Sequence, residues 1–366
     1  MCQNKTVCRV EMKKKILHLA YLDKFIPGFI ELILQRFSDE PHTMLTFGDI
    51  KKYYYEQSIS MRNFSTLKSF RAILEMICAM HSNDKIILHG LFSSNLVMLL
   101  CFMPWLHSKC AWIIWGGDLY YHKLAKKNFR YHFSEIFRKF LISRLGGFIT
   151  YIEGDYHNAQ QWYKANGKLY ECIMYKSNVY SGSVLTEDDL TQSRVRDSIK
   201  INIQVGNSAD PTNNHLKVFE QLVKLDVQNC VGKIYCPLSY GNPVYATQIK
   251  QLGVAMFGEK FCPLMDFMPL AQYNEILNEV DIAIFAHNRQ QAMGNTINLL
   301  GRGKTVYMHT DTSSYRLLTK LGIKVFSLDD LALTVQPSDI AIANNQLVRN
   351  YFSEDNLVSQ LKSIFA

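Results

Sequence analysis

The chain has 366 residues, of which 48% are hydrophobic and 20% charged, enough for about two globular domains and unlike a disordered, collagenous or coiled-coil chain. Polar residues at 93–95 and Pro104 interrupt the longest apolar run, so no membrane-spanning helix is predicted. The first 15 residues lack the apolar core of a signal peptide, so we expect a cytoplasmic protein. Nine scattered cysteines without a Cys-x-x-Cys pair predict reduced thiols and no zinc site.

The formal net charge is +8, and the whole basic excess lies in the first half of the chain. The segment from Lys123 to Leu145 holds seven Lys or Arg and one acid between Phe, Ile and Leu residues, which predicts a basic amphipathic helix or helix pair. Such a segment suits an anionic membrane surface. The alternatives are an ordinary helix with a solvated basic face and nucleic-acid binding, but no recognition motif supports nucleic acid.

Short apolar runs alternate with helix-length segments, a pattern typical of parallel sheets covered by helices on both faces. In the first half we expect helices over residues 27–37 and 65–80. Strands are expected at 15–19, 44–47, 85–89, 111–115 and 148–152.

A polar stretch at 181–198 is predicted to be a linker between an N-terminal domain, 1–180, and a second doubly wound domain, 199–345. A helical tail, 346–366, would follow, with its last helix at about 355–365. In the second domain, strands are expected at 200–205, 233–237, 254–257, 282–286, 305–309 and 324–327. Two such domains would face a cleft, and ligands of doubly wound sheets bind beyond the carboxyl ends of the strands.

Two loops of the second domain are candidates for binding a phosphorylated ligand. The first loop runs from Gly206 to His215 and combines a glycine with small polar residues before a helix, which is suited to an anion. A loop that merely caps that helix is the alternative. The second loop follows residues 282–286 and joins a cation, an imidazole and several amides. Arg289 can pair two phosphate oxygens, His287 can donate to a phosphate or a sugar hydroxyl, and the amides can read sugar substituents. A surface loop capped by Asn295 is the alternative here.

In the first domain, the strand at 111–115 leads into Gly116, Gly117 and Asp118. Asp118 is a candidate general base at the edge of the cleft, and the neighbouring aromatic residues can stack on sugars. A tight turn with Asp118 as a helix cap explains the residues equally well. Tyr240, after another expected strand, can stack on a nucleobase or sugar.

Several motifs are absent. The chain has no G-x-G-x-x-G fingerprint and no P-loop, which disfavours dinucleotide oxidoreductases and P-loop enzymes. It also lacks a G-x-S-x-G elbow, an H-E-x-x-H motif and a clear D-x-D pair that would hold a metal on a nucleotide diphosphate. Cationic side chains and helix ends would therefore have to neutralise a bound diphosphate, without a metal.

Four segments together resemble glycosyltransferase family 56, the dTDP-4-acetamido-4,6-dideoxygalactose (Fuc4NAc) transferases, also called 4-alpha-L-fucosyltransferases. They are WIIWGGDLY at 112–120, VGNSADPTNNH at 205–215, LSYGNPVYA at 238–246 and FAHNRQQAMGN at 285–295. The resemblance implies an α/β fold of the GT-B type, with two doubly wound, Rossmann-like domains. It also implies a dTDP-sugar donor as substrate, no cofactor, and an undecaprenyl-diphosphate-linked acceptor at the cytoplasmic face of the bacterial inner membrane.

Combined with this resemblance, the candidate residues identified above lead to a hypothesis for the transfer step. Asp118 would be the base if the sugar is transferred with inversion, and Arg289 and His287 would hold the diphosphate leaving group. Better-known GT-B enzymes hold the ribose with a Glu whose nearest counterpart here is Asn298, which is compatible with a deoxyribose donor. The residues expected to bind the donor are Gly206, Asn207, Ser208, Asp210, Asn213, His215, Tyr240, Gln290, Gln291, Gly294, Asn295, Thr296 and Asn298.

The predicted function is therefore transfer of a Fuc4NAc-like sugar during assembly of enterobacterial common antigen or O-antigen, by a peripheral, metal-independent enzyme. Two alternatives remain open. A GT-B-type sugar-nucleotide epimerase would need several carboxylates in the cleft, and only Asp118 is well placed. A non-catalytic adaptor on the membrane surface would leave the loop around Arg289 unexplained.

Overall fold

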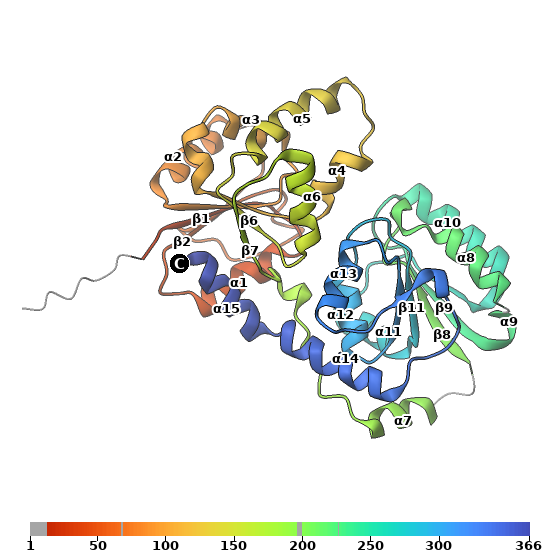
Figure 1. Cartoon of the computed structure of the whole chain (residues 1–366). Coiled ribbons are helices and arrows are strands. Elements are labelled where there is room, and N and C mark those ends of the chain that lie inside the picture. Colours follow the sequence, from red (N-terminus) through yellow and green to blue (C-terminus); the bar gives the residue numbers. More distant parts are fainter. Residues whose placement is uncertain (1–12, 67–68, 196–199, 226) are drawn as a thin grey trace, which may run out of the picture. The chain divides into compact units, whose positions relative to one another are not determined.

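The computed structural model describes residues 13–66, 69–195, 200–225 and 227–366, which form two units (Figure 1). The first unit comprises the described residues up to 150 together with 158–176 and 358–366. The second comprises 151–157 and 177–357. Each unit has its own parallel sheet and its own buried core, so the α/β fold class predicted from the sequence is confirmed.

The first unit is built on a seven-stranded sheet in the order β3-β2-β1-β4-β5-β6-β7. Every pair of neighbouring strands is parallel, and β1 is buried along its length except for Tyr21, as expected of a strand covered on both faces. The strands are β1 (Ile16–Tyr21), β2 (His42–Phe47), β3 (Met61–Phe64), β4 (Lys85–His89), β5 (Cys110–Ile113), β6 (Gly147–Ile149) and β7 (Lys168–Tyr170).

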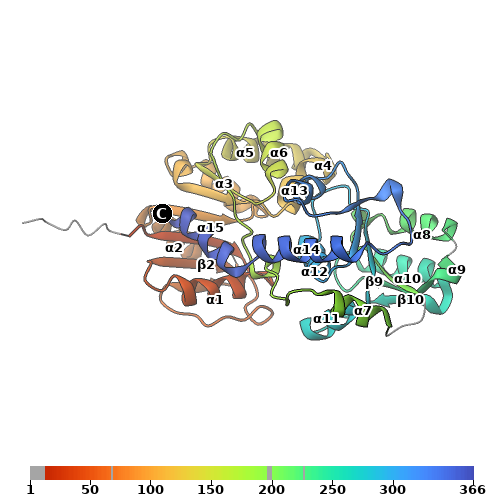
Figure 2. The same ribbon diagram turned by 60° about the horizontal axis from the view of Figure 1, so that its bottom comes forward.

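Helices connect these strands and cover the sheet (Figure 2). The basic segment predicted as a helix or helix pair forms mainly one helix, α5 (Phe129–Ile142), and its first two residues are the end of α4 (Gly117–Leu124). The other helices are α1 (Ile26–Arg36), α2 (Phe70–Ser82), α3 (Ser94–Cys101), η1 (Pro104–Lys109), α6 (Glu153–Tyr163), η2 (Lys176–Asn178) and α15 (Glu354–Phe365), of which α6, η2 and α15 contribute residues to both units. The last residues of α15 pack into the first unit, where the Phe365 ring meets the imidazoles of His18 and His42.

The second unit has a six-stranded parallel sheet in the order β10-β9-β8-β11-β12-β13. The strands are β8 (Ile201–Val205), β9 (Val231–Pro237), β10 (Phe261–Leu264), β11 (Ile282–Phe285), β12 (Thr305–Met308) and β13 (Phe326–Ser327). The helices are α7 (Glu187–Val195), η3 (Pro211–Asn213), α8 (His215–Lys224), α9 (Val227–Cys230), α10 (Pro243–Phe257), η4 (Gly258–Lys260), α11 (Leu270–Glu279), α12 (Met293–Gly301), α13 (Ser313–Lys320), η5 (Leu328–Asp330) and α14 (Ser338–Tyr351). Helices α8 and α10 lie side by side in both views (Figure 1, Figure 2).

Most predicted strands are present, but the one expected at 254–257 is wrong. These residues form the end of α10, which begins where the Asn242 side chain accepts hydrogen bonds from the amides of Val244 and Tyr245. A short apolar run does not distinguish a strand from the buried side of a helix. The segment predicted as a linker, 181–198, contains α7. No helix in the described parts of the chain is long and apolar enough to cross a membrane.

Candidate functional site

The two candidate loops of the second unit follow neighbouring strands, β8 and β11. Strand β8 pairs with β9 on one side and with β11 on the other, so the strand order reverses between β8 and β11. In doubly wound sheets this reversal opens a crevice at the carboxyl ends of the strands, where ligands bind. The structure therefore brings the loop from Gly206 to His215 beside the loop that contains Arg289.

Gly206 and Asn213 shape the first loop. Gly206 has a φ of +67°, and a Cβ at this position would lie 2.6 Å from Nε2 of His215. The fully buried Asn213 side chain accepts a hydrogen bond from the Asn207 amide at 2.9 Å and donates to the hydroxyl of Ser208 at 3.2 Å. Asn213 therefore holds the loop in one conformation from inside.

His287 links the second loop to the first. Its Nε2 lies 2.9 Å from Oδ1 of Asn213, and because the Asn213 amide nitrogen donates elsewhere, the imidazole must be the donor. Burial lowers the pKa of His287 to about 3, so the ring is neutral at pH 7. A neutral ring that donates through Nε2 carries an acceptor at Nδ1. Whether His287 contacts the donor diphosphate stays a prediction.

Arg289 is the cation at this edge of the sheet. Its guanidinium lies 3.5 Å from Oδ2 of Asp210 and donates to the Gln290 carbonyl at 3.1 Å. The other carboxylate oxygen of Asp210 accepts from the Thr212 amide and hydroxyl. Arg289 keeps a buried Nε without a partner, so its donors are only partly used.

Gln291 and Tyr240 extend the network. The Gln291 amide nitrogen donates to Oδ1 of Asn207 at 3.2 Å, and its Oε1 lies 2.9 Å from the Thr212 hydroxyl oxygen. Asn207 in turn donates to the Tyr240 hydroxyl at 2.7 Å, while the Tyr240 ring remains about half exposed. The exposed ring is available to stack on a base or a sugar.

The remaining predicted residues lie at or behind the start of α12 or in the core. Helix α12 begins after Ala292 without a side-chain cap, so the amide groups of its first turn point outward unpaired by a capping side chain. Gln290 precedes this turn, and Gly294, Asn295 and Thr296 belong to it. Asn298 donates back to the Gly294 carbonyl. His215 is fully buried beside Tyr245, which places it in the packing below the loop.

In the first unit, Asp118 is buried at the start of α4, after β5. Its Oδ2 accepts from the Leu91 amide and from the Trp112 indole, at 2.9 and 2.8 Å. Its Oδ1 accepts from the Trp115 and Leu119 amides. Desolvation raises the pKa of Asp118, although these donors and the nearby Arg138 oppose the rise. The carboxylate thus ties the loop after β4 to the loop after β5. Its role as a base stays a prediction.

Three residues of these networks escaped the sequence analysis as individual contributors. Thr212 bridges Asp210 and Gln291, but a threonine within a polar loop gives no signal of its own. Arg138 donates to the Leu91 carbonyl at 2.7 Å and to the Asp118 carbonyl at 2.8 Å, although the sequence analysis treated the basic residues of its helix as one membrane-facing or solvated group. No sequence signal marks Leu91, which contributes only its backbone. No cluster of three potential metal ligands occurs among the residues with described positions.

Comparison with models of protein families shows to which family the chain belongs. Residues 25–354 match the family model described as 4-alpha-L-fucosyltransferase, glycosyl transferase group 56. The chain belongs to this family. The resemblance seen in the four sequence segments is thereby confirmed, and this member of family 56 is a glycosyltransferase.

Solved glycosyltransferase structures share the fold of this family 56 member. WaaG, a glycosyltransferase involved in lipopolysaccharide biosynthesis, matches with a TM-score of 0.59 and 11% identity over 96% of this chain and 98% of that one. A glycosyltransferase from Rickettsia africae ESF-5 gives 0.62 and 15% over 96% and 98%. Alr3699/HepE from Anabaena, in complex with UDP, gives 0.62 and 12% over 96% and 99%. The predicted GT-B type of fold is therefore confirmed.

Proposed function

We propose that this glycosyltransferase moves a Fuc4NAc-like deoxyaminosugar from a dTDP-sugar to a polyprenyl-diphosphate-linked oligosaccharide, in the assembly of enterobacterial common antigen or O-antigen. The second unit would bind the donor and the first unit the acceptor. Family membership supports the sugar transfer. The similarity to HepE, which was solved with UDP and with UDP-glucose, supports a nucleotide-sugar donor.

One observation carries the donor assignment. Arg289, with unused donors, lies four residues before the uncapped N-terminus of α12, at the strand reversal of the second sheet. A guanidinium and the amides of a helix N-terminus are the groups that bind phosphate in proteins. Together they would hold the diphosphate without a metal. Asn298, a neutral residue where related enzymes carry a carboxylate, supports a deoxyribose nucleotide.

In the transfer step, the acceptor hydroxyl oxygen would form a bond to the anomeric carbon while the bond from that carbon to the diphosphate breaks. Negative charge then develops on the departing dTDP, and Arg289 with the α12 amides would stabilise it. The hydroxyl proton would pass to Asp118 if the reaction inverts. Because both Asp118 oxygens already accept hydrogen bonds, the acceptor would have to share or replace one of these donors.

Titration with nucleotides tests the donor assignment directly. Thermal unfolding is followed with dTDP, UDP, GDP and ADP, each with and without EDTA. A ligand that binds only the folded protein raises its apparent stability. We expect dTDP to stabilise most, with no effect of EDTA. Selective stabilisation by UDP or GDP would contradict the donor, and loss of stabilisation in EDTA would contradict metal independence.

Arg289→Ala tests the role of the cation. We expect turnover at saturating acceptor to fall by roughly two to three orders of magnitude, the range seen when one donor to a developing charge is removed. Arg316→Ala is the matched control, because Arg316 is exposed on α13 of the same unit and, among the described residues, donates only to the Asp311 carbonyl. Equal activity of the two variants would refute the role of Arg289.

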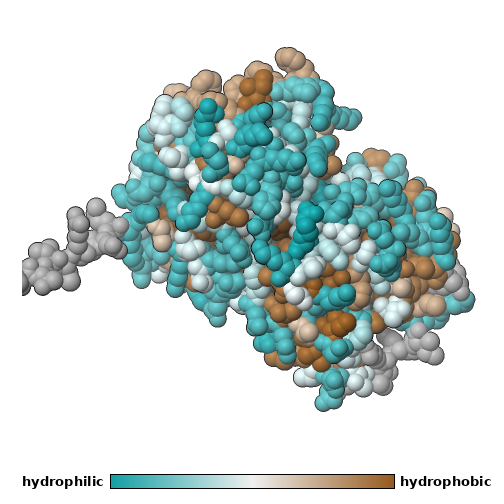
Figure 3. Space-filling model, in the orientation of Figure 1, coloured by the Kyte–Doolittle hydropathy of each residue, from teal (hydrophilic) through white to brown (hydrophobic). Residues whose placement is uncertain are grey.

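The peripheral position at the membrane is also a proposal. Helix α5 exposes the apolar side chains of Phe129 and Ile136, at 84% and 67%, beside several basic residues. Figure 3 shows hydrophobic residues gathered on the surface of the first unit over α3 and α5. Exposed aromatic residues next to cations are the features with which proteins insert into an anionic lipid surface.

A further inference from the structure

A pocket of about 320 Å³ opens in the first unit between α3, α4 and α5. This volume is at the lower end of the range of small-molecule sites, roughly 300 to 1,000 Å³. Residues directly after β4 and β5 form one wall, including Phe92 and Asp118. The pocket therefore lies at the carboxyl edge of the first sheet, where doubly wound sheets bind their ligands.

The lining of the pocket is mainly apolar and aromatic. Val97 and Met98 line it from α3, and Phe129, Phe133 and Phe137 line it from α5. The rings of the three phenylalanines follow one another at centroid distances of 6.5 and 5.1 Å. They form a continuous wall that begins at the largely exposed Phe129 and ends at the partly buried Phe137.

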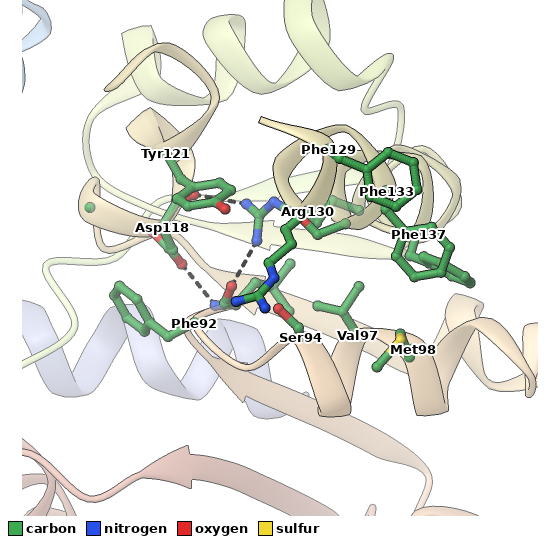
Figure 4. A pocket seen from close by; sticks show the side chains of 14 residues that line it. Phe92, Ser94, Val97, Met98, Asp118, Tyr121, Phe129, Arg130, Phe133 and Phe137 are labelled. Atoms are coloured by element: carbon green, nitrogen blue, oxygen red, sulfur yellow. Dashed lines mark hydrogen bonds between the residues drawn. The ribbon is translucent and has the colours of Figure 1, made fainter. Parts of the chain in front are cut away.

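Two arginines line this apolar surrounding. Arg138 is already paired with Glu135 and with the carbonyls of Leu91 and Asp118, which leaves Arg130. Figure 4 shows the Arg130 side chain pointing into the pocket, with Phe133 and Phe137 on one side of it and Phe92 on the other. Among the described residues, Arg130 has no carboxylate within ion-pair distance. Asp118, the one acid of the lining, is occupied by its four donors. The charge of Arg130 thus remains available to an anion.

An apolar channel with one unpaired guanidinium is complementary to a hydrocarbon chain that carries a phosphate at one end. A sugar can stack on one ring but would leave Val97, Met98 and the rest of the phenylalanine wall without an apolar partner, and a free anion would leave the whole wall exposed. We propose that this pocket binds the phosphate-proximal part of the apolar chain of an isoprenyl diphosphate, with Arg130 contacting the diphosphate. This inference deepens the proposed function, on which it rests, by placing the lipid part of the acceptor.

Calorimetric titration with farnesyl diphosphate, below the concentration at which it aggregates, tests the pocket. Farnesol and inorganic diphosphate are titrated separately. We expect farnesyl diphosphate to bind at least about tenfold more tightly than either, because only it uses both the wall and the cation. Binding of inorganic diphosphate with the same affinity would reduce the pocket to an anion site, and absence of binding by farnesyl diphosphate would overturn the proposal.

Matched variants on α5 locate the binding. Phe133→Ser and Arg130→Gln should each weaken farnesyl diphosphate by about tenfold or more. Their controls are Ile136→Ser and Lys139→Gln, exposed residues of the same helix that do not line the pocket, for which affinity should stay within about twofold. If Phe133→Ser and Ile136→Ser lose the same affinity for farnesyl diphosphate, the lipid binds to the apolar surface of α5 in general, and the pocket proposal is refuted. Unchanged melting of each variant excludes unfolding.

Further outcomes distinguish failure of the pocket proposal from failure of the proposed function, and lipid binding from dimer formation. A response to dTDP without binding of farnesyl diphosphate would overturn the pocket and leave the proposed function in place. Binding of farnesyl diphosphate without a response to any nucleotide would support the pocket and contradict the proposed nucleotide-sugar donor. A concentration-dependent dimer that Phe133→Ser abolishes and farnesyl diphosphate does not compete with would assign the pocket to a second copy of the chain.

Discussion

Buried amide and carboxylate side chains, rather than main-chain bonds alone, fix the loops of both candidate regions. In the second unit, Asn213 satisfies donors and acceptors from Asn207, Ser208 and His287. In the first unit, Asp118 does the same for the loops after β4 and β5. Because these side chains are fully enclosed, each replacement leaves several partners unpaired, and its cost extends beyond one hydrogen bond.

The variant Asp118→Asn distinguishes two roles of Asp118, stabilising the loops and acting as a catalytic base. The new amide nitrogen would face donors such as the Leu91 amide or the Trp112 indole, so we expect a loss of about 2 to 3 kcal/mol in unfolding free energy, measured with denaturant. Asp39→Asn, at an exposed position of the same unit, should change stability little. Substantial turnover by folded Asp118→Asn protein, below its melting temperature, would contradict the role of Asp118 as base.

Gly206→Ala tests the packing of the loop from Gly206 to His215. Its Cβ would lie 2.6 Å from Nε2 of His215 and 2.8 Å from Oδ1 of Asn213, so the loop must move. Gly258→Ala is the control, because Gly258 also has a positive φ but no neighbouring atom lies within 4 Å of the place that its new methyl group would take. The control should cost only the backbone strain of its positive φ, about 1 to 3 kcal/mol. We expect Gly206→Ala to melt lower and to lose its stabilisation by nucleotide. Equal melting and nucleotide response in both variants would show that the contacts are unimportant.

Among the elements, the buried central strands were predictable, whereas of the edge strands in the described parts of the chain only β13 was predicted, at 324–327. Strand β4 was predicted with its observed ends, because all but its first residue is buried and apolar residues follow one another along it. Strands β3, β7 and β10 were missed, and all three lie at an edge of a sheet, where a strand is only partly covered and needs no continuous apolar run.

The candidate loops of the second unit were predictable for a related reason. Polar residues that directly follow the buried strands β8 and β11 mark the sheet edge where ligands bind. The pocket beside α5 was not predictable, since Arg130 and Val97 come from elements that only the tertiary fold brings together. The hydrogen bonds of Arg138 also join residues 20 and 47 positions apart.

Helix α5 and the segment before it make the membrane proposal testable at the level of an element. Lys126→Gln combined with Lys127→Gln should weaken binding to phosphatidylglycerol vesicles by roughly 30-fold, at about 1 kcal/mol per basic residue. Lys217→Gln combined with Lys224→Gln removes the same charge from exposed positions of α8 and should have little effect. Co-sedimentation measures the vesicle binding of both double variants. Equal losses of binding would indicate that the net charge of the protein, and not the position of the lysines, determines membrane binding.

At the scale of the whole molecule, both units enclose neutral histidines. In the first unit, His18 lies between His42 and His89, at 3.0 and 3.1 Å. Burial lowers the pKa of His42 to about 4 and of His89 to about 3, and that of His18 well below its usual value. In the second unit, burial lowers the pKa of His215 to about 4.

These histidines predict a loss of stability in mild acid. The unfolded chain takes up protons below about pH 6.5 while the folded chain does not, so stability is complete above that pH and falls progressively toward pH 4. Each histidine contributes about 1.4 kcal/mol per pH unit in this window. Denaturant unfolding between pH 7.5 and 5 measures the slope. His42→Gln should reduce it, and the exposed His157→Gln should not. An unchanged slope in His42→Gln would contradict the assignment.

The return of the chain to the first unit has a consequence for synthesis. Residues 358–366 complete the first unit, and Phe365 packs there against Phe37 and His42. All other residues of this unit precede 177. A ribosome therefore makes the whole second unit before the last piece of the first one exists. During that time the surface awaiting Phe365 is uncovered and open to chaperones. A fragment ending at residue 176 would keep that surface exposed permanently, so the first unit cannot be expressed by simple truncation without losing part of its core.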